Sequence, residues 1–182
     1  MKTNILIALK NVLECKNRRL SEVYQSSAKN KVNGVGDALE YFVKDLFCST
    51  MEVSSIDEKK EKHKEYLSYL GSATKPPDFI IRKSLAVEVK KQDGLSFGEI
   101  QLNSSYPKDY LSSESTMIKD ECKHCEDEVG GWDKKDMLYA IGNVKEKELR
   151  VLWLVDGECY CADSSVYEEC RKSVEEALHK RA

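Results

Sequence analysis

Three charged side chains near the middle of the chain have the types and spacing of a phosphodiester-cleaving site. Asp78 follows two prolines, and nine residues separate it from Glu88, which is followed two residues later by Lys90. Short apolar runs on both sides of Lys83-Ser84 predict a β-hairpin, whose alternation places Glu88 and Lys90 on one face. Carboxylates on adjacent strands suit Mg²⁺, and a neighbouring lysine can orient or help deprotonate an attacking water.

The same residues also have an ordinary structural interpretation. A Glu-x-Lys pair on a strand is often a surface ion pair, and an aspartate after proline is a common turn residue. Spacing alone therefore leaves three hypotheses open. These are a site-specific nuclease, a DNA repair or junction-resolving nuclease, and a non-catalytic DNA-binding or interaction module.

A helix upstream of the hairpin supplies a further acid. Its predicted extent is from about Gly34 to Phe47, because apolar residues fall on one helical stripe: Val35, Leu39, Phe42, Val43, Leu46 and Phe47. Glu40 lies at the edge of that stripe, beside Phe47. A half-shielded carboxylate there fits the wall of a site, and equally fits a flanking ion pair.

These residues resemble a known signature. Pro77-Asp78 followed by Glu88-Val89-Lys90 resembles the PD-(D/E)XK nuclease motif. A wider ordered set is similar to the NgoPII-type type II restriction endonucleases: Gly36-Asp37-Ala38-Leu39-Glu40, Pro76-Pro77-Asp78, Ala86-Val87-Glu88-Val89-Lys90-Lys91, Leu102-Asn103-Ser104-Ser105-Tyr106-Pro107-Lys108 and Tyr160-Cys161-Ala162-Asp163. The short motif is weak by itself, whereas the ordered set is fairly specific.

The resemblance implies an α/β, restriction-endonuclease-like fold with a mixed central β-sheet flanked by helices. It implies Mg²⁺-dependent cleavage of double-stranded DNA, with Asp78 and Glu88 as metal ligands and Lys90 as the catalytic residue that positions water. The backbone carbonyl of Val89 would be a further ligand, and Glu40 would support the metal directly or through water. Relatives of this type are associated with the palindrome GGCC, which this chain is then expected to cut.

The resemblance also implies partners. Predicted DNA contacts are Lys91, Asn103, Ser104, Ser105 and Lys108. The alternative is a polar turn at residues 103–108 and a solvated strand end at Lys91. Cutting both strands of a palindrome implies a homodimer, and a restriction enzyme implies a cognate DNA methyltransferase as genetic partner. Family members continue past the closing helix, so a chain ending at Ala182 is expected to be a C-terminally shortened member.

Composition agrees with a soluble protein. The chain has 182 residues, 41% of them hydrophobic and 34% charged, with a net charge of −3, which predicts a single nuclease domain over residues 1–182. It has no apolar run of the roughly 20 residues that span a bilayer and no export signal, so no membrane contact and a cytoplasmic location are expected. Seven cysteines without an export signal predict reduced thiols. One zinc-like hook, Cys122-x-x-Cys125, is a weaker interpretation.

Further elements follow from periodicity and turn residues. An amphipathic helix is expected at Ile5–Leu13 and a closing helix at Val166–His179. Strands are expected at 66–70, near 100–102, at 137–144 and at 149–155; loops at 25–33 and 92–98; and a helix from Ser115 or Thr116 towards Glu128. Residues 57–65 contain no apolar side chain, which predicts an exposed segment with a solvated His63.

Overall fold

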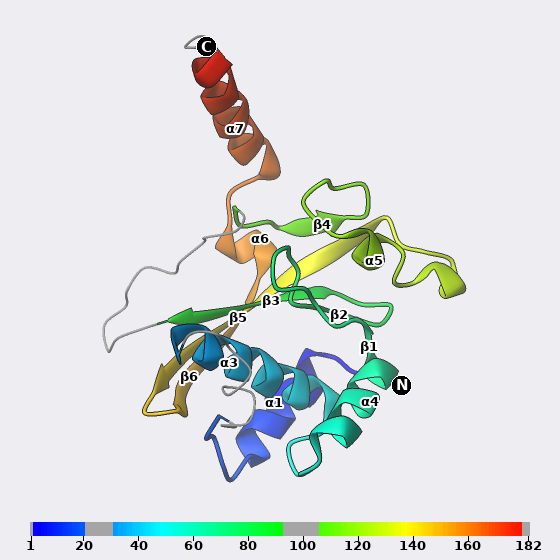
Figure 1. Cartoon of the computed structure of the whole chain (residues 1–182), viewed down its shortest axis with the longest axis vertical. Helices are drawn as coiled ribbons and strands as arrows, with labels where there is room; N and C mark the ends of the chain where they lie inside the picture. Colours follow the sequence, from blue (N-terminus) through cyan, green and yellow to red (C-terminus); the bar gives the residue numbers. More distant parts are fainter. Residues whose placement is uncertain (1, 21–30, 93–105, 180–182) are drawn as a thin grey trace.

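The computed structural model describes residues 2–20, 31–92 and 106–179, and its centre is a mixed six-stranded β-sheet (Figure 1). The strands are β1 (Leu67–Tyr69), β2 (Phe79–Ile81), β3 (Ala86–Gln92), β4 (Tyr110–Ser112), β5 (Lys134–Lys145) and β6 (Glu148–Asp156). The helices are α1 (Ile5–Glu14), α3 (Lys31–Cys48), α4 (Ile56–Tyr66), α5 (Asp120–Lys123), α6 (Gly157–Tyr160) and α7 (Ser164–His179), with a 3₁₀ turn at Asp127–Val129. The predicted mixed sheet flanked by helices is confirmed.

Strand β5 is the central strand of the sheet and pairs with three others. It pairs in parallel with β3 along one edge, from Ala86–Met137 to Gln92–Asn143. Along its other edge β4 pairs with the start of β5 and β6 with the rest, both antiparallel. Most of β5 is buried, as expected for a strand covered on both faces. The β3–β5 register therefore fixes which side chains of β5 lie beside those of the β2–β3 hairpin.

Two separate cores cover the two faces of the sheet. On one face, α1 and α3 pack over Phe79, Val87 and Leu138. On the other face, Ile80, Met137, Tyr139 and Ile141 lie under residues 111–122. Neighbouring residues in each strand thus belong to opposite cores, which is the alternation expected of a pleated sheet.

Most of the predicted elements are confirmed: α1, α3, β1, the β2–β3 hairpin, β5, β6 and α7 lie where the sequence places them. The loop predicted at 25–33 is wrong for its last three residues, because α3 already begins at Lys31, and Gln92 belongs to β3. Residues 25–30, the rest of the loop after Gln92, and the strand expected near 100–102 lie outside the described residues. Among the helices that are described, none is long and apolar enough to cross a membrane.

The helix predicted from Ser115 or Thr116 is wrong. The Ser115 hydroxyl accepts the N–H of Met117 within a turn, and α5 begins only at Asp120. Serine side chains compete in this way with helical backbone bonds, so a capping residue by itself does not start a helix.

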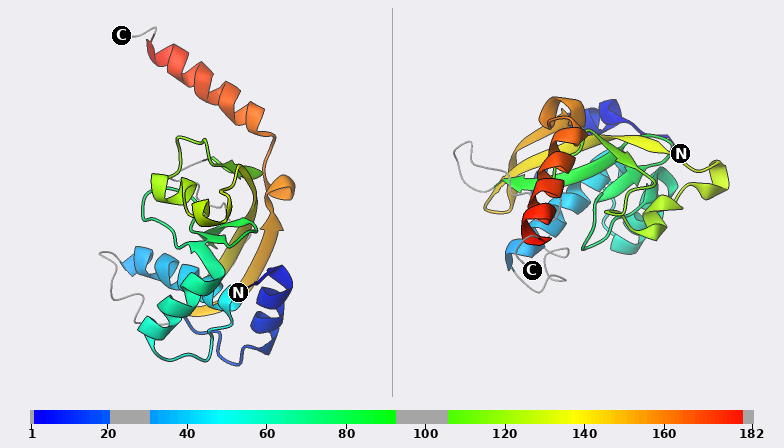
Figure 2. Two further views of the ribbon diagram at one scale, coloured as in Figure 1. Left: turned by 90° about the vertical axis from the view of Figure 1, so that its right-hand side faces the viewer. Right: turned by 90° about the horizontal axis from the view of Figure 1, so that it is seen from above.

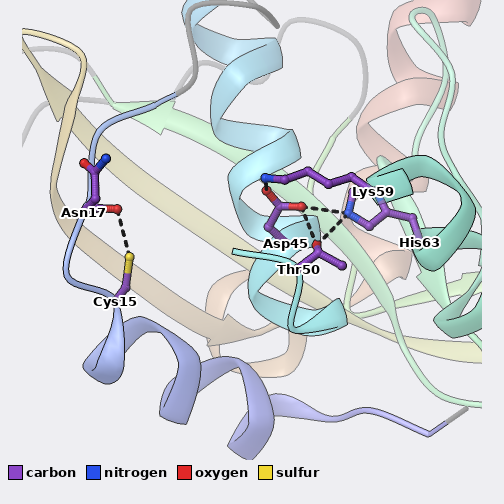
Figure 3. Close-up of polar contacts among 6 residues, drawn as sticks. All are labelled: Cys15, Asn17, Asp45, Thr50, Lys59 and His63. Carbon is purple, nitrogen blue, oxygen red and sulfur yellow. Dashed lines mark hydrogen bonds and ion pairs between the residues drawn. The ribbon is translucent and has the colours of Figure 1, made fainter. Parts of the chain in front are cut away.

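The prediction of a solvated His63 is also wrong. Residues 56–66 form α4, and His63 is only 1% exposed, because its Nε2 lies 2.9 Å from Oδ1 of Asp45 on α3. The Thr50 hydroxyl donates to the same Oδ1 at 2.5 Å, and Lys59 pairs with Oδ2 (Figure 3). A cluster of polar side chains packs α4 against α3. Because this contact is polar, the sequence of α4 carries no apolar stripe that would have predicted it.

Helix α7 extends away from the sheet (Figure 2). Its base is attached by the Ser164 hydroxyl, which donates to Asp109 at 2.8 Å, and by Tyr167, whose ring stacks on Tyr106 with centroids 5.2 Å apart. The apolar stripe predicted for this helix is exposed rather than buried, with Val174 59% and Leu178 65% exposed.

Candidate active site

The hairpin brings Asp78 against strand β3. The N–H of Asp78 donates to the carbonyl of Val87 at 3.1 Å, and the N–H of Val89 donates to Oδ2 of Asp78 at 2.6 Å. The backbone of Asp78 is thus held by Val87, and its carboxylate is held by Val89. These two valines flank Glu88 in the sequence. This arrangement brings Asp78 and Glu88 together, as the sequence predicts.

Gly71 makes this placement possible. Its φ is +94°, and a Cβ at this position would lie 2.2 Å from the carbonyl oxygen of Asp78. Any larger residue would therefore push the backbone of Asp78 away, in addition to the strain of a positive φ.

Glu88 and Lys90 share one face of β3, while Val87 is buried on the other. Lys90 Nζ donates to Oε1 of Glu88 at 2.7 Å. Glu88 is only 7% exposed, and its second oxygen, Oε2, is buried with no hydrogen-bond partner among the described residues. A buried carboxylate oxygen without a donor is costly, which makes it a candidate ligand for a cation.

Glu40 reaches this region from α3. Its Oε1 accepts a 2.5 Å hydrogen bond from Lys44, whose Nζ also donates to the carbonyl of Leu70 at 2.7 Å. Burial raises the pKa of Glu40; Lys44 opposes that rise, and the charges of Asp37 and Glu88 add to it. Glu40 is therefore near enough to Glu88 to interact with its charge, and its direct partner is Lys44.

Negative charge accumulates around Asp78. Burial raises the pKa of Asp78 well above its usual range, and the charges of Glu88 and Glu40 raise it further, against the N–H of Val89 and the charge of Lys90. A bound cation would relieve this repulsion. Within the described parts of the chain, no three His, Cys, Asp or Glu side chains form a cluster that could hold a metal by themselves.

The donors present nevertheless fit a hard cation that brings other ligands with it. Mg²⁺ keeps several waters and commonly uses one or two protein carboxylates together with phosphate oxygens of the substrate. The free Oε2 of Glu88 and the carboxylate of Asp78 meet that requirement.

Sequence reasoning missed two residues near these acids. Asp37 lies one helical turn before Glu40 and lines the same cavity, a relation that the spacing of three residues could have revealed. Tyr139 is the register partner of Glu88 across β3–β5. No local pattern identifies that neighbour, because it depends on how two distant strands align.

The predicted DNA contacts fall in different places. Lys108 is buried and lines a small cavity together with Glu88 and Lys90. Lys91 follows on β3 and is half-buried. Asn103, Ser104 and Ser105 lie outside the described residues.

A cavity of about 480 Å³ opens elsewhere, beside Asp45 and Cys15. The Cys15 thiol donates to the carbonyl of Asn17 at 2.9 Å (Figure 3), and Asp45 is paired with Lys59 and His63. These polar groups already have partners within the protein, whereas Oε2 of Glu88 has none among the described residues, which favours the hairpin as the candidate site.

The cysteines form no metal-binding cluster within the described residues. All seven are free, and burial raises the pKa of the Cys122 thiol to about 12. The indole of Trp132 donates to the carbonyl of Cys122 at 3.2 Å, and its ring packs against the second core. The described residues thus give no support to the zinc interpretation.

Comparison with known proteins identifies one family. The sequence model of the NgoPII restriction endonuclease family matches residues 3–182. The chain belongs to the NgoPII restriction endonuclease family. It is 37% identical over 154 residues to the "Type II restriction enzyme NgoPII" of Neisseria gonorrhoeae, a match that covers 84% of this chain and 53% of that enzyme. The matched region spans about half the length of this relative. No solved structure matches the chain.

Proposed function

We propose that this NgoPII-family chain is a type II restriction endonuclease that hydrolyses phosphodiester bonds of double-stranded DNA with Mg²⁺. The observation that carries this proposal is the unpartnered Oε2 of Glu88 beside Asp78, on a hairpin with Lys90. Family membership and the name of the matched relative support cleavage at a specific DNA site.

Asp78 and Glu88 would hold the Mg²⁺, with the Val89 carbonyl as a further ligand. Glu40 would act through a water, because its Oε1 is bonded to Lys44. Bound Mg²⁺ supplies two effects, a lower pKa for a coordinated water and stabilisation of charge on the phosphate.

Lys90 then has a defined task. Its Nζ lies 2.7 Å from Oε1 of Glu88, so it would donate a hydrogen bond to the attacking water beside that carboxylate. In the reaction, a P–O bond forms to the water oxygen, and the P–O bond to one sugar oxygen breaks. The water loses a proton to a basic group or to solvent, and the departing oxygen gains one.

The finer assignments follow from the same function. The proposed DNA contacts are Lys91, Asn103, Ser104, Ser105 and Lys108. The recognition sequence would be a short palindrome, and GGCC is the one we propose. Two copies, each a single nuclease domain over residues 1–182, would cut the two strands as a homodimer in the cytoplasm. A cognate methyltransferase would protect the host DNA.

Plasmid cleavage tests the proposal. The protein is incubated with plasmid DNA with Mg²⁺ or with EDTA, and the ends are sequenced. Discrete ends at one palindrome, only with Mg²⁺, are the expected result. Cutting confined to branched or mismatched DNA would identify a repair or junction-resolving nuclease. The absence of any Mg²⁺-dependent cutting would leave a non-catalytic DNA-binding or interaction module.

A further inference from the structure

Lys108 is a buried lysine that lines a small cavity with Glu88 and Lys90. It is only 7% exposed, and its Nζ donates to the carbonyl of Tyr106 at 2.9 Å while lying 4.1 Å from the centre of the Tyr106 ring. Within the described regions, no carboxylate forms an ion pair with it. An ammonium has three donor hydrogens, so this one retains bonding capacity that no group of the described residues uses.

The fold places Lys108 on the face of the sheet that carries Glu88 and Lys90. Tyr139 is the register partner of Glu88 on the adjacent strand, and its hydroxyl accepts the N–H of Lys108 at 2.7 Å. Lys108 therefore lines the same small cavity as Glu88 and Lys90. The segment before β4 is thus attached directly beside the hairpin.

The backbone of Lys108 is also held from α6. A Cβ at Gly157 would lie 2.7 Å from the carbonyl oxygens of both Lys108 and Asp109, so the two backbones are in close contact. The ring of Tyr160 packs on Tyr139 with centroids 4.5 Å apart. Strand β5 and helix α6 thus fix the backbone of Lys108.

A buried ammonium that lacks a counter-ion is unfavourable unless an anion arrives from outside. Glu88 lines the same cavity, but no ion pair joins it to Lys108: its Oε1 accepts from Lys90, and its Oε2 would hold the Mg²⁺ of the proposed function. The cavity, of about 10 Å³, has room for about one water-sized group, so a single oxygen of a bound phosphate would supply the missing acceptor. Lys90 would donate a hydrogen bond to the attacking water, and Lys108 would donate one to the phosphate.

We propose that Lys108 is a second catalytic lysine, whose ammonium contacts a non-bridging oxygen of the phosphodiester being cut. The inference rests on the proposed nuclease function. Charge grows on the non-bridging oxygens as the bond to water forms and the bond to the sugar breaks, and a donor positioned beforehand stabilises it. Tyr139 and Gly157 are positioning residues, because they hold Lys108 and do not touch the substrate.

Single-turnover cleavage at saturating protein separates this role from that of a distant DNA contact. With an oligonucleotide duplex that contains the mapped site, Lys108→Met is expected to lower the rate about 100-fold, the loss typical of one removed charge-stabilising donor. DNA binding measured with Ca²⁺ in place of Mg²⁺ should weaken only a few-fold, and Lys108→Arg should recover part of the rate. Tyr139→Phe keeps the ring but removes the hydroxyl, and should lower the same rate about 10-fold.

Lys134→Met is the matched control. Lys134 lies at the same 4.1 Å from a tyrosine ring, that of Tyr110, but it is exposed and does not line the cavity. Its saturating rate should equal that of the wild type. An unchanged saturating rate in both Lys108→Met and Tyr139→Phe, with an active wild type, would overturn this inference alone. A wild type that cuts no DNA would overturn the proposed function, and this inference with it.

Discussion

Two buried glutamates of this chain, Glu126 and Glu88, have opposite surroundings. Glu126 is 3% exposed, and both of its oxygens are fully used. Oε1 accepts the Ser68 hydroxyl at 2.8 Å and the N–H of Lys83 at 2.7 Å, while Oε2 accepts Nζ of Lys135 at 2.9 Å. Because Lys83 occupies the turn of the β2–β3 hairpin, with φ of +56°, Glu126 holds the end of the hairpin opposite Asp78.

Glu88 is nearly as buried, at 7% exposed, but half of its bonding capacity is unused. Among the described residues it forms an ion pair with Lys90, and the acids Asp78 and Glu40 interact unfavourably with its charge. The comparison separates two purposes of a buried acid. A satisfied carboxylate stabilises the fold, whereas an unsatisfied one among like charges is maintained for a ligand.

The largest expected effect comes from removing the charge of the unsatisfied acid. Glu88→Gln should lower Mg²⁺-dependent cleavage by at least about 10³-fold, or about 4 kcal/mol of transition-state stabilisation, because a metal ligand is lost. DNA binding in Ca²⁺ and the melting temperature should change little. Full activity in this variant, or in Asp78→Asn, would refute the site assignment.

The same change at the satisfied acid should affect stability instead. Glu126→Gln leaves the Lys135 ammonium buried and unpaired, so the free energy of unfolding should fall by about 3 kcal/mol. Urea denaturation measures it. Cleavage per folded molecule should remain at the wild-type level. A variant as stable as the wild type would show that Glu126 does not anchor the hairpin turn.

The surroundings of Glu88 on the hairpin could be predicted from the sequence. Asp78, Glu88 and Lys90 are close in the chain, and strand alternation is a local rule, so their convergence could be predicted. The apolar stripe of α3 likewise placed Glu40 near the site. Local spacing determines both features, and the structure confirms the placement.

The satisfied clusters could not be predicted, because their partners come from distant segments. Glu126 belongs to an acidic run, where a solvated side chain is the usual expectation, yet its partner Ser68 is 58 residues away. His63 was misjudged for the same reason, since only the packing of α4 on α3 brings it to Asp45. Contacts between segments that are distant in the sequence, such as the one between Lys108 and Tyr139, cannot be predicted from local spacing.

Metal binding should distinguish the two acids without any cleavage assay. If Mg²⁺ binds the folded protein only, ten times its dissociation constant should stabilise the wild type by about 1.4 kcal/mol. The thermal shift should persist in Glu126→Gln and disappear in Glu88→Gln, and EDTA should reverse it. Equal shifts in the two variants would mean that Mg²⁺ binds away from Glu88.

The smallest expected effect is the acid dependence of Glu126. Burial alone would raise its pKa, but the N–H of Lys83, the ammonium of Lys135 and the Ser68 hydroxyl together hold that pKa below its ordinary value. A carboxyl whose pKa is lower in the folded state contributes stability that is present above its unfolded pKa, about 4.3, and is lost as the pH falls through the folded pKa. The stability difference between the wild type and Glu126→Gln should therefore shrink from pH 6 to pH 3 in urea titrations. If that difference instead stays constant across the range, the contribution of Glu126 comes from its shape and neutral hydrogen bonds, and its charge stabilises the hairpin no more than an amide does.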